Sequence, residues 1–430
     1  MTKLEQLINE LCPNGVEYKT LGEIAVDVFR GAGIKRDEVT EEGVPCVRYG
    51  EIYTTYGVWF DECVSHTVLE NVPSPKYFEH GDILFAITGE SVEDIAKSCA
   101  YVGYEKCLAG GDIVVLKHTQ DPKYLAYALS TTEAQMQKSK GKVKSKVVHS
   151  SVPAIKGIVV PVPPIEVQRE IVRILDNFTE LTAELTAELT ARKQQYEYYR
   201  ESLLTQSLQT ENVPLSELAN FTYGYTDTAK DEGDTRFIRI TDITDDGCLN
   251  PDNAKYITLT EDSRKYLLRK GDLLLARTGA TYGKTLYYPN DEQAVYASFL
   301  IKITLDNSRI LNRYYWHFSK SGLYWKQAEK LVSKGGQQQF NANAVERVVV
   351  PVPPLEVQER LVRVLDNFDT ICTDLNIGLP AEIEARKKQY EYYRDMLLSF
   401  AENGGCSQFA NVERERERER ERERSGRSAD

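Results

Sequence analysis

A run of evenly spaced lysines is the feature of this sequence with the clearest chemistry. Residues 137–146 read QKSKGKVKSK, with a lysine at every second position from 138 to 146. In an extended backbone, alternate side chains point to one face, so the ammonium groups would form a basic strip that binds phosphates. The alternative is an ordinary solvated loop. The lysines of the strip are Lys138, Lys140, Lys142, Lys144 and Lys146.

A second polar segment occupies the corresponding place later in the chain. Residues 334–343 read KGGQQQFNAN. Glutamine and asparagine amides donate and accept together, so they can pair with an adenine edge, and the glycines let a backbone approach a ligand closely. The alternative is a polar turn. We expect the following residues to contact nucleic acid: Lys334, Gln337, Gln338, Gln339, Asn341 and Asn343.

Residues 277–285, RTGATYGKT, resemble a phosphate-binding P-loop but lack one glycine. That motif needs glycine at position 278, where this chain has threonine, and Gly279 leaves too short a loop before Gly283. Nucleotide binding is therefore disfavoured. The segment is better interpreted as a loop that presents four polar side chains to a nucleic acid. They are Arg277, Thr278, Tyr282 and Lys284.

Other cationic and aromatic residues complete the candidate nucleic-acid set, although each could equally have a structural role. They are Arg30, Lys35, Arg36, Arg48, His149, Tyr223, Tyr225, Arg236 and Arg239. Enzyme signatures are missing: the sequence has no HExxH, no GxSxG, no Asn/Asp-Pro-Pro-aromatic methyltransferase motif and no metal-ligand spacing among its histidines. We therefore expect a protein without its own catalysis, metal or directly bound cofactor.

The elements that must position these residues form an internal duplication. Residues 159–178 and 349–368 are identical at 15 of 20 positions, and residues 191–204 and 385–398 at 11 of 14. The offset rises from 190 to 194 between the two blocks, so the second copy is four residues longer. A period this long indicates a duplicated domain rather than a solenoid repeat.

Each copy predicts a β-rich domain followed by a long helix. The first part is rich in β-branched and aromatic residues, and the later part has apolar residues every three or four positions after Pro164 and Pro354. Gly378 and Pro380 predict a kink or break in the second helix. We expect an α+β protein with two mixed, β-rich domains joined by two antiparallel coiled-coil helices, related by a pseudo-twofold axis.

The expected boundaries follow from these patterns. They are residues 1–162 for the first domain, 163–210 for the first long helix, 211–352 for the second domain, 353–403 for the second helix and 404–430 for a tail containing six Glu-Arg pairs. The first helix contains a tandem Thr-Ala-Glu-Leu repeat. Each four-residue unit adds ~6 Å and ~40° of rotation, so it could act as a length ruler or simply be a good helix former. The repeat is marked by Thr182, Leu185, Thr186 and Leu189.

Composition limits the class of protein. The 430 residues have a net charge of −12, so nucleic-acid binding requires local basic patches or positively charged partners. No apolar run approaches the ~18–20 residues that span a bilayer, and the N-terminus has no apolar signal region. Eight cysteines without a CxxC pair suit reduced thiols. We expect a cytoplasmic protein that does not enter a membrane.

The layout resembles the DNA-specificity subunit of type I restriction–modification systems. The blocks PVPPIEVQREIVRILDNF and PVPPLEVQERLVRVLDNF, the segment TAELTAELTARKQQYEYYR and the opening LCPNGVEYKTLGEI carry the resemblance. The resemblance implies two target-recognition domains that each read half of a split double-stranded DNA sequence, with helices that set the spacer and dock two methyltransferase subunits. It also implies that S-adenosylmethionine, and ATP and Mg with motor-nuclease subunits, are used by partners. A coiled-coil scaffold without DNA specificity is the alternative.

Overall fold

The sequence duplication corresponds to two structural units in a computed structural model of the chain. Unit 1 comprises Met1–Glu184 and Glu384–Asp430, and unit 2 comprises Leu185–Ile383. The division passes through the long helices, so each unit contains one β-rich domain together with parts of both helical segments. The structure describes residues 2–140, 147–205, 210–333, 338–374 and 378–400.

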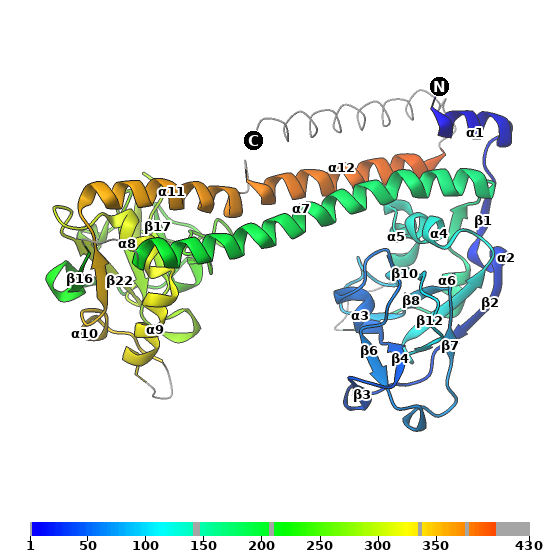
Figure 1. Ribbon diagram of the computed structural model, residues 1–430, viewed down its shortest axis with the longest axis horizontal. Helices are drawn as coiled ribbons and strands as arrows, with labels where there is room; N and C mark the ends of the chain where they lie inside the picture. Colours follow the sequence, from blue (N-terminus) through cyan, green and yellow to red (C-terminus); the bar gives the residue numbers. More distant parts are fainter. Residues whose placement is uncertain (1, 141–146, 206–209, 334–337, 375–377, 401–430) are drawn as a thin grey trace. The chain divides into compact units, whose positions relative to one another are not determined.

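Two five-stranded sheets form the β-rich part of unit 1 (Figure 1). The first sheet has the order β2 (Ala25–Arg30), β12 (Ile113–His118), β8 (Ile83–Ala86), β10 (Ser98–Tyr101) and β5 (Trp59–Phe60). The second has the order β3 (Val39–Thr40), β6 (Ser65–Thr67), β4 (Val44–Val47), β11 (Cys107–Ala109) and β7 (Tyr77–Phe78). All four residues of β8 are buried, because both faces of this central strand are covered.

Short strands and helices complete unit 1. Two-stranded pairs join β1 (Tyr18–Thr20) to β14 (Val159–Pro161) and β9 (Thr88–Gly89) to β13 (Val148–His149). The helices are α1 (Lys3–Leu11), α2 (Leu21–Ile24), α3 (Tyr49–Thr54), α4 (Pro122–Leu129), α5 (Thr132–Ser139) and α6 (Val152–Lys156).

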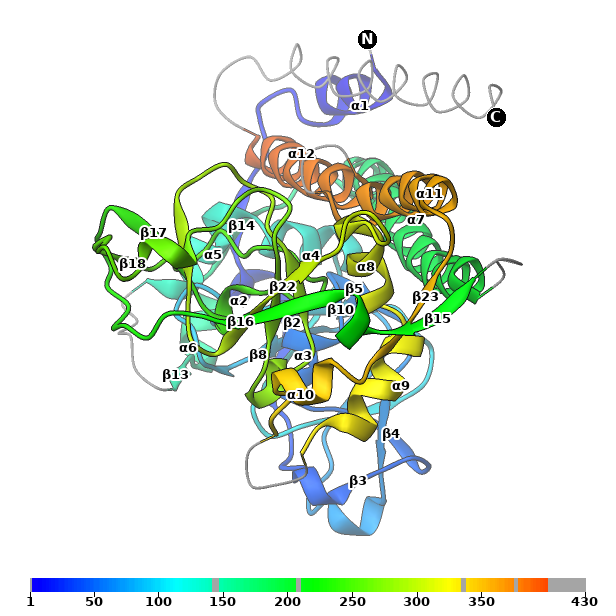
Figure 2. The same cartoon turned by 90° about the vertical axis from the view of Figure 1, so that its left-hand side faces the viewer.

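Unit 2 repeats this plan in a shorter form. A four-stranded sheet, in which β16 and β22 lie side by side (Figure 2), has the order β16 (Ala219–Tyr223), β22 (Leu300–Leu305), β19 (Leu273–Ala276) and β20 (Thr285–Tyr287). A three-stranded sheet has the order β18 (Tyr256–Ile257), β17 (Thr235–Ile238) and β21 (Ala294–Tyr296). The remaining elements are the pair β15 (Glu211–Pro214) and β23 (Val349–Val352), and helices α8 (Asn312–Ser319), α9 (Gly322–Leu331) and α10 (Ala342–Val345).

Matched glycines show how closely the two backbones correspond. Gly31 follows β2 and Gly224 follows β16. A Cβ atom at either position would lie 2.2 Å from a carbonyl oxygen, that of Gly110 in unit 1 and that of Ala297 in unit 2. Only glycine allows this approach between the two segments. The duplicated fold predicted from the sequence is therefore confirmed in its backbone.

The first helical segment is one continuous helix, and the second is interrupted. Helix α7 (Ile165–Thr205) begins directly after Pro164 and runs from unit 1 into unit 2. The later segment forms α11 (Leu355–Thr373) and α12 (Leu379–Ser399), with Gly378 between them and Pro380 in the first turn of α12. Proline lacks the N–H that a helix interior needs. The predicted break in the second helical segment is therefore confirmed.

Aromatic side chains pack the helices against one another inside each unit. In unit 1, the rings of Phe178 in α7 and Tyr393 in α12 are 5.5 Å apart. In unit 2, the rings of Tyr196 and Tyr199 in α7 lie 6.0 and 5.6 Å from that of Phe368 in α11. Each unit therefore contains its own aromatic contact between α7 and the later helical segment.

A repeated glutamine fixes the start of each helix to its own domain. The side-chain amide of Gln168 donates to the Pro163 carbonyl at 2.7 Å, and that of Gln358 donates to the Pro353 carbonyl at 2.7 Å. Their side-chain oxygens accept from the backbone N–H groups of Asp121 and Leu311. These buried bonds explain why the repeated block retains Val-Gln at this position.

Candidate nucleic-acid interface

The end of β19 gathers several of the predicted site residues of unit 2. The backbone N–H of Arg277 donates to the Phe299 carbonyl at 3.1 Å, and the N–H of Phe340 donates to the Arg277 carbonyl at 2.8 Å. Next along the chain, Thr278 forms a β-bridge with Gln339. Two segments that are distant in the sequence therefore present their side chains at one place.

The guanidinium of Arg277 lies close to two aromatic rings. Its carbon is 5.3 Å from the ring centre of Tyr223 and 5.6 Å from that of Phe299, while its Nε donates to the Ser298 carbonyl at 3.1 Å. Tyr223 is 43% exposed and Phe299 is 51% exposed. We call these three residues, Tyr223, Arg277 and Phe299, the Arg277 cluster. Exposed rings with a cation can stack on bases or bind phosphates.

Phe299 is a member of this cluster that the sequence does not reveal, because nothing local marks it as part of a site. It follows Ser298 in the tight turn between β21 and β22, where the N–H of Leu300 donates to the Ala297 carbonyl. The turn places its ring against a guanidinium from another strand. An aromatic residue in such a turn is often part of the core, so only the tertiary fold shows that this one is exposed.

Around the Arg277 cluster, some predicted residues are exposed and others are buried or bonded within the protein. Gln338, Gln339 and Asn343 are exposed. Asn341 caps α10 by accepting the N–H of Ala344 at 3.1 Å, and Thr278 is 3% exposed. Tyr282 packs edge-on against the rings of Trp325 and Phe340. Lys334 and Gln337 lie outside the described residues.

Four further predicted residues of unit 2 have partners within the protein. Arg236 is buried and donates to the Asn250 carbonyl at 2.8 Å. Arg239 pairs with Asp242 at 2.7 Å, and Lys284 pairs with Asp245. The Tyr225 ring packs 5.5 Å from that of Tyr266. Each of these side chains has an intramolecular partner, and its contact with DNA stays a prediction.

Lys138 in unit 1 is buried, contrary to the prediction of an extended basic strip. It lies in helix α5, is 4% exposed, and donates to the Leu129 carbonyl at 2.7 Å and to Ser98 Oγ at 3.2 Å. Burial lowers the pKa of its ammonium group to about 7. Lys140, at the helix end, is exposed. Lys142, Lys144 and Lys146 lie outside the described residues, so their role stays a prediction.

Two predicted site residues of unit 1, Arg36 and Arg48, line a surface hollow that adjoins a second one. Arg36, Arg48 and Tyr49 line a surface hollow of about 660 Å³, and Tyr49 also lines a second hollow of about 420 Å³ beside Thr88. His149 is exposed, and its Nδ1 lies 3.2 Å from Thr88 Oγ1. This β9–β13 contact matches the Thr278–Gln339 bridge of unit 2 at the repeat offset of 190.

Several cations in unit 1 are partly neutralised. The Nε of Arg48 lies 3.3 Å from a Glu51 carboxylate oxygen, and Lys35 lies 3.3 Å from Glu38. Arg30 donates through Nε to the Gly111 carbonyl and pairs with Asp112. Of these pairs, Arg30–Asp112 is the one exposed on both sides, so a phosphate could compete with it. The Arg48–Glu51 pair has a buried carboxylate, as does the Arg239–Asp242 pair of unit 2.

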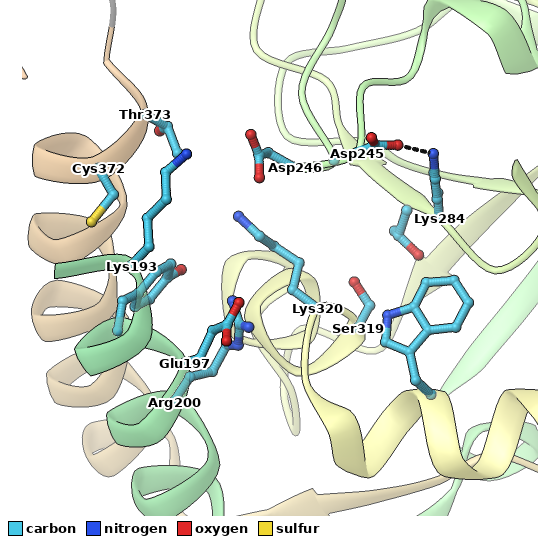
Figure 3. A pocket seen from close by; sticks show the side chains of 14 residues that line it. Lys193, Glu197, Arg200, Asp245, Asp246, Lys284, Ser319, Lys320, Cys372 and Thr373 are labelled. Carbon is cyan, nitrogen blue, oxygen red and sulfur yellow. Dashed lines mark hydrogen bonds and ion pairs between the residues drawn. The ribbon is translucent and has the colours of Figure 1, made fainter. Parts of the chain in front are cut away.

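A separate cavity of about 210 Å³ lies within unit 2, where charged groups of both signs face the same space (Figure 3). Its lining includes Lys193, Arg200 and Lys320, opposed by Glu197 and Asp246. The lining also contains the Lys284–Asp245 pair, which makes four cations and three carboxylates in all. Because these cations face carboxylates of the same cavity, we do not assign it to the nucleic-acid interface.

Metal-binding clusters and membrane-spanning helices are both absent from the described parts of the chain. In those parts, no group of three histidine, cysteine, aspartate or glutamate side chains is placed to hold a metal ion. No described helix is long and apolar enough to cross a membrane.

Comparison with known proteins gives a single consistent family. A family model described as the type I restriction modification DNA specificity domain matches residues 13–192 and again 209–385. A Haemophilus influenzae protein named as a type I restriction enzyme specificity subunit is 34% identical over 278 residues, or 61% of this chain and 68% of that protein. The EcoR124I/EcoR124II specificity subunit of Escherichia coli is 32% identical over 294 residues, or 65% and 70%.

A solved chain shares the fold across both units. It comes from a structure described as the basis of complex assembly and conformational transition of the type I R-M system, and it covers 91% of this chain and 99% of its own length. Its TM-score is 0.63 at 17% identity. Together with a family model that matches twice and spans most of the sequence, these likenesses show that the chain belongs to the DNA specificity subunits of type I restriction–modification systems.

Proposed function

We propose that this chain reads a bipartite double-stranded DNA site, with one half-site bound by each unit, and that the length of α7 sets the spacer between the halves. Two methyltransferase subunits dock on the helices, and motor-nuclease subunits join them for restriction. S-adenosylmethionine, and ATP with Mg when a motor-nuclease is present, are used by these partners, and the complex works in the cytoplasm. The partners supply positive charge that a chain of net charge −12 lacks.

The supporting observation is that the two units match in backbone but differ in exposed side chains. Strand pairing matches Arg30 of unit 1 with Tyr223 of unit 2, and Asp112 with Phe299. The two residues of unit 1 form an ion pair, whereas the two of unit 2 are aromatic. His149 likewise corresponds to Gln339 at the offset of 190. Two equal scaffolds with unlike surfaces suit the recognition of two different DNA sequences.

In contrast, the bonds that hold two short helices of each unit against the strand before its long helical segment are the same in both copies. Tyr124 donates to the Pro161 carbonyl as Tyr314 does to that of Pro351. Gln137 exchanges two hydrogen bonds with the backbone of Val159, and Gln327 does so with Val349. Retention of this framework in both copies supports a common way of joining each β-rich domain to the helical segment that follows it.

The test is modified-base sequencing of DNA from cells that express this chain with its methyltransferase subunit. The expected result is methylation at two short motifs separated by a fixed stretch of unspecified bases. A single continuous motif, or methylation without sequence preference, would contradict the proposal. The second outcome would favour the coiled-coil scaffold, which the family membership already disfavours.

A further inference from the structure

Arg277 keeps most of its hydrogen-bonding capacity free for a ligand. Its Nε donates to the Ser298 carbonyl at 3.1 Å. Among the residues that the structure describes, no carboxylate lies within ion-pair distance of its guanidinium, and its two Nη groups have no protein acceptor. Arginine is always charged and carries donors in a rigid planar fork. A half-buried fork without a counter-ion is suited to an external acceptor.

The two rings of the Arg277 cluster fix the orientation of that fork. The guanidinium carbon lies 5.3 Å from the Tyr223 ring centre and 5.6 Å from that of Phe299. Tyr223 is itself held, because its hydroxyl oxygen accepts the N–H of Ala342 at 3.2 Å and Gly224 allows close approach to the Ala297 carbonyl. The Arg277 side chain is therefore partly ordered before a ligand binds, which lowers the entropic cost of forming a contact with fixed geometry.

Unit 1 also has an arginine that donates to the corresponding backbone carbonyl, but a carboxylate neutralises its charge. In the β2–β12 register Arg30 pairs with Val114, as Tyr223 pairs with Ile301 in β16–β22. Arg30 Nε donates to the Gly111 carbonyl, which matches that of Ser298, and its Nη2 pairs with Asp112. The carboxylate occupies part of the fork in unit 1, whereas Phe299 leaves it open in unit 2.

From these contacts we infer that Arg277 reads a guanine base in the half-site of unit 2, with Tyr223 and Phe299 holding its guanidinium in the reading plane. The two free Nη donors match the O6 and N7 acceptors that guanine presents in the major groove. This inference rests on the proposed function, namely that unit 2 binds one half-site. A phosphate contact by the same arginine is the competing outcome, and it would carry no sequence preference.

The first test compares the methylated motifs of complexes containing wild-type chain, Arg277→Gln or Arg277→Lys. Arg264→Gln serves as the matched control, because Arg264 is an exposed arginine of unit 2 paired with Glu261. We expect Arg277→Gln to relax the requirement for one guanine in one half-site, to leave the other half-site unchanged, and to leave the spacer unchanged. Arg264→Gln should leave the whole motif unchanged.

The second test uses wild-type protein and therefore does not depend on the folding of a variant. The purified complex is bound to duplexes in which each guanine in turn is replaced by 7-deazaguanine, which lacks the N7 acceptor. At one guanine we expect affinity to fall about tenfold, because one of the two hydrogen bonds is lost and one Nη donor is left without an acceptor. Phe299→Ala should reduce this factor, because it releases the guanidinium plane.

Three outcomes would overturn the inference while leaving the proposed function intact. They are a bipartite motif without guanine in either half-site, tolerance of 7-deazaguanine at every position, and an Arg277→Gln variant that weakens all sequences equally with an unchanged motif. A wild-type chain that yields no bipartite motif would instead contradict the proposed function.

Discussion

The ammonium group of Lys138 donates a hydrogen bond of 2.7 Å to the backbone carbonyl of Leu129, inside the core of unit 1. It also reaches Ser98 Oγ and lies 6.0 Å from the Phe85 ring centre. Helix α5 turns this side chain inward, although the alternating lysine pattern predicts an exposed strip. Lys138 therefore holds α5 and α4 together rather than binding DNA.

Replacing Lys138 with methionine should reduce the pH dependence of stability in unit 1. Burial lowers the folded pKa to about 7, below the ~10.4 of an unfolded lysine, so the unfolded state binds more protons between these values. Stability of the wild type should therefore rise from pH 7 to pH 10, with a slope of up to about 1.4 kcal/mol per pH unit from this group. Melting temperatures measured across this range should rise less steeply for Lys138→Met. An equal slope in both proteins would show that Lys138 is not buried in solution, and Lys140→Met is the exposed control.

The lysines that follow Lys138 should contribute to DNA affinity without affecting sequence choice. Replacing Lys140, Lys142, Lys144 and Lys146 with alanine should weaken binding to all duplexes and reduce the slope of log K against log salt by about 0.9 for each phosphate that is no longer neutralised. The measurement is fluorescence anisotropy of the methyltransferase complex at several salt concentrations. Lys138→Met should retain the wild-type slope. If the fourfold variant also retains it, the basic strip does not touch DNA.

Adding one Thr-Ala-Glu-Leu unit to α7 should lengthen the recognised spacer. Thr182, Leu185, Thr186 and Leu189 all lie within the continuous helix α7. Four more helical residues add ~6 Å, which corresponds to about one to two base pairs of ~3.4 Å. Methylation-site mapping should show both half-motifs unchanged with a longer gap. An unchanged gap would mean that the repeat is only a good helix former.

Gln358→Ala should destabilise unit 2 by removing buried hydrogen bonds at the start of α11. The amide donates to the Pro353 and Arg309 carbonyls and accepts the N–H of Leu311, so substitution leaves three backbone groups unsatisfied. The expected cost is about 2–4 kcal/mol. Urea unfolding followed by circular dichroism measures it. Gln194→Ala, on the exposed face of α7, should change stability by less than about 0.5 kcal/mol.

The sequence alone determined the duplication, the two β-rich domains, the long helix after Pro164 and the break near Pro380. These features follow from residue identity, from apolar residues at every third or fourth position and from the missing N–H of proline, all of which act locally. The repeated sequence blocks also sufficed to predict membership of the DNA specificity subunits, because they resemble that family.

Only the tertiary structure decided which polar side chains are free. Lys138 is buried because α5 packs against α4 and β10. Arg236 and Lys284 are bonded to residues on other segments, whereas Arg239 pairs with Asp242 three residues along the chain. Conversely, Phe299 joins Arg277 and Tyr223 through strand pairing between residues far apart in the chain. Exposure and pairing depend on long-range packing, which a local pattern of residue types does not contain.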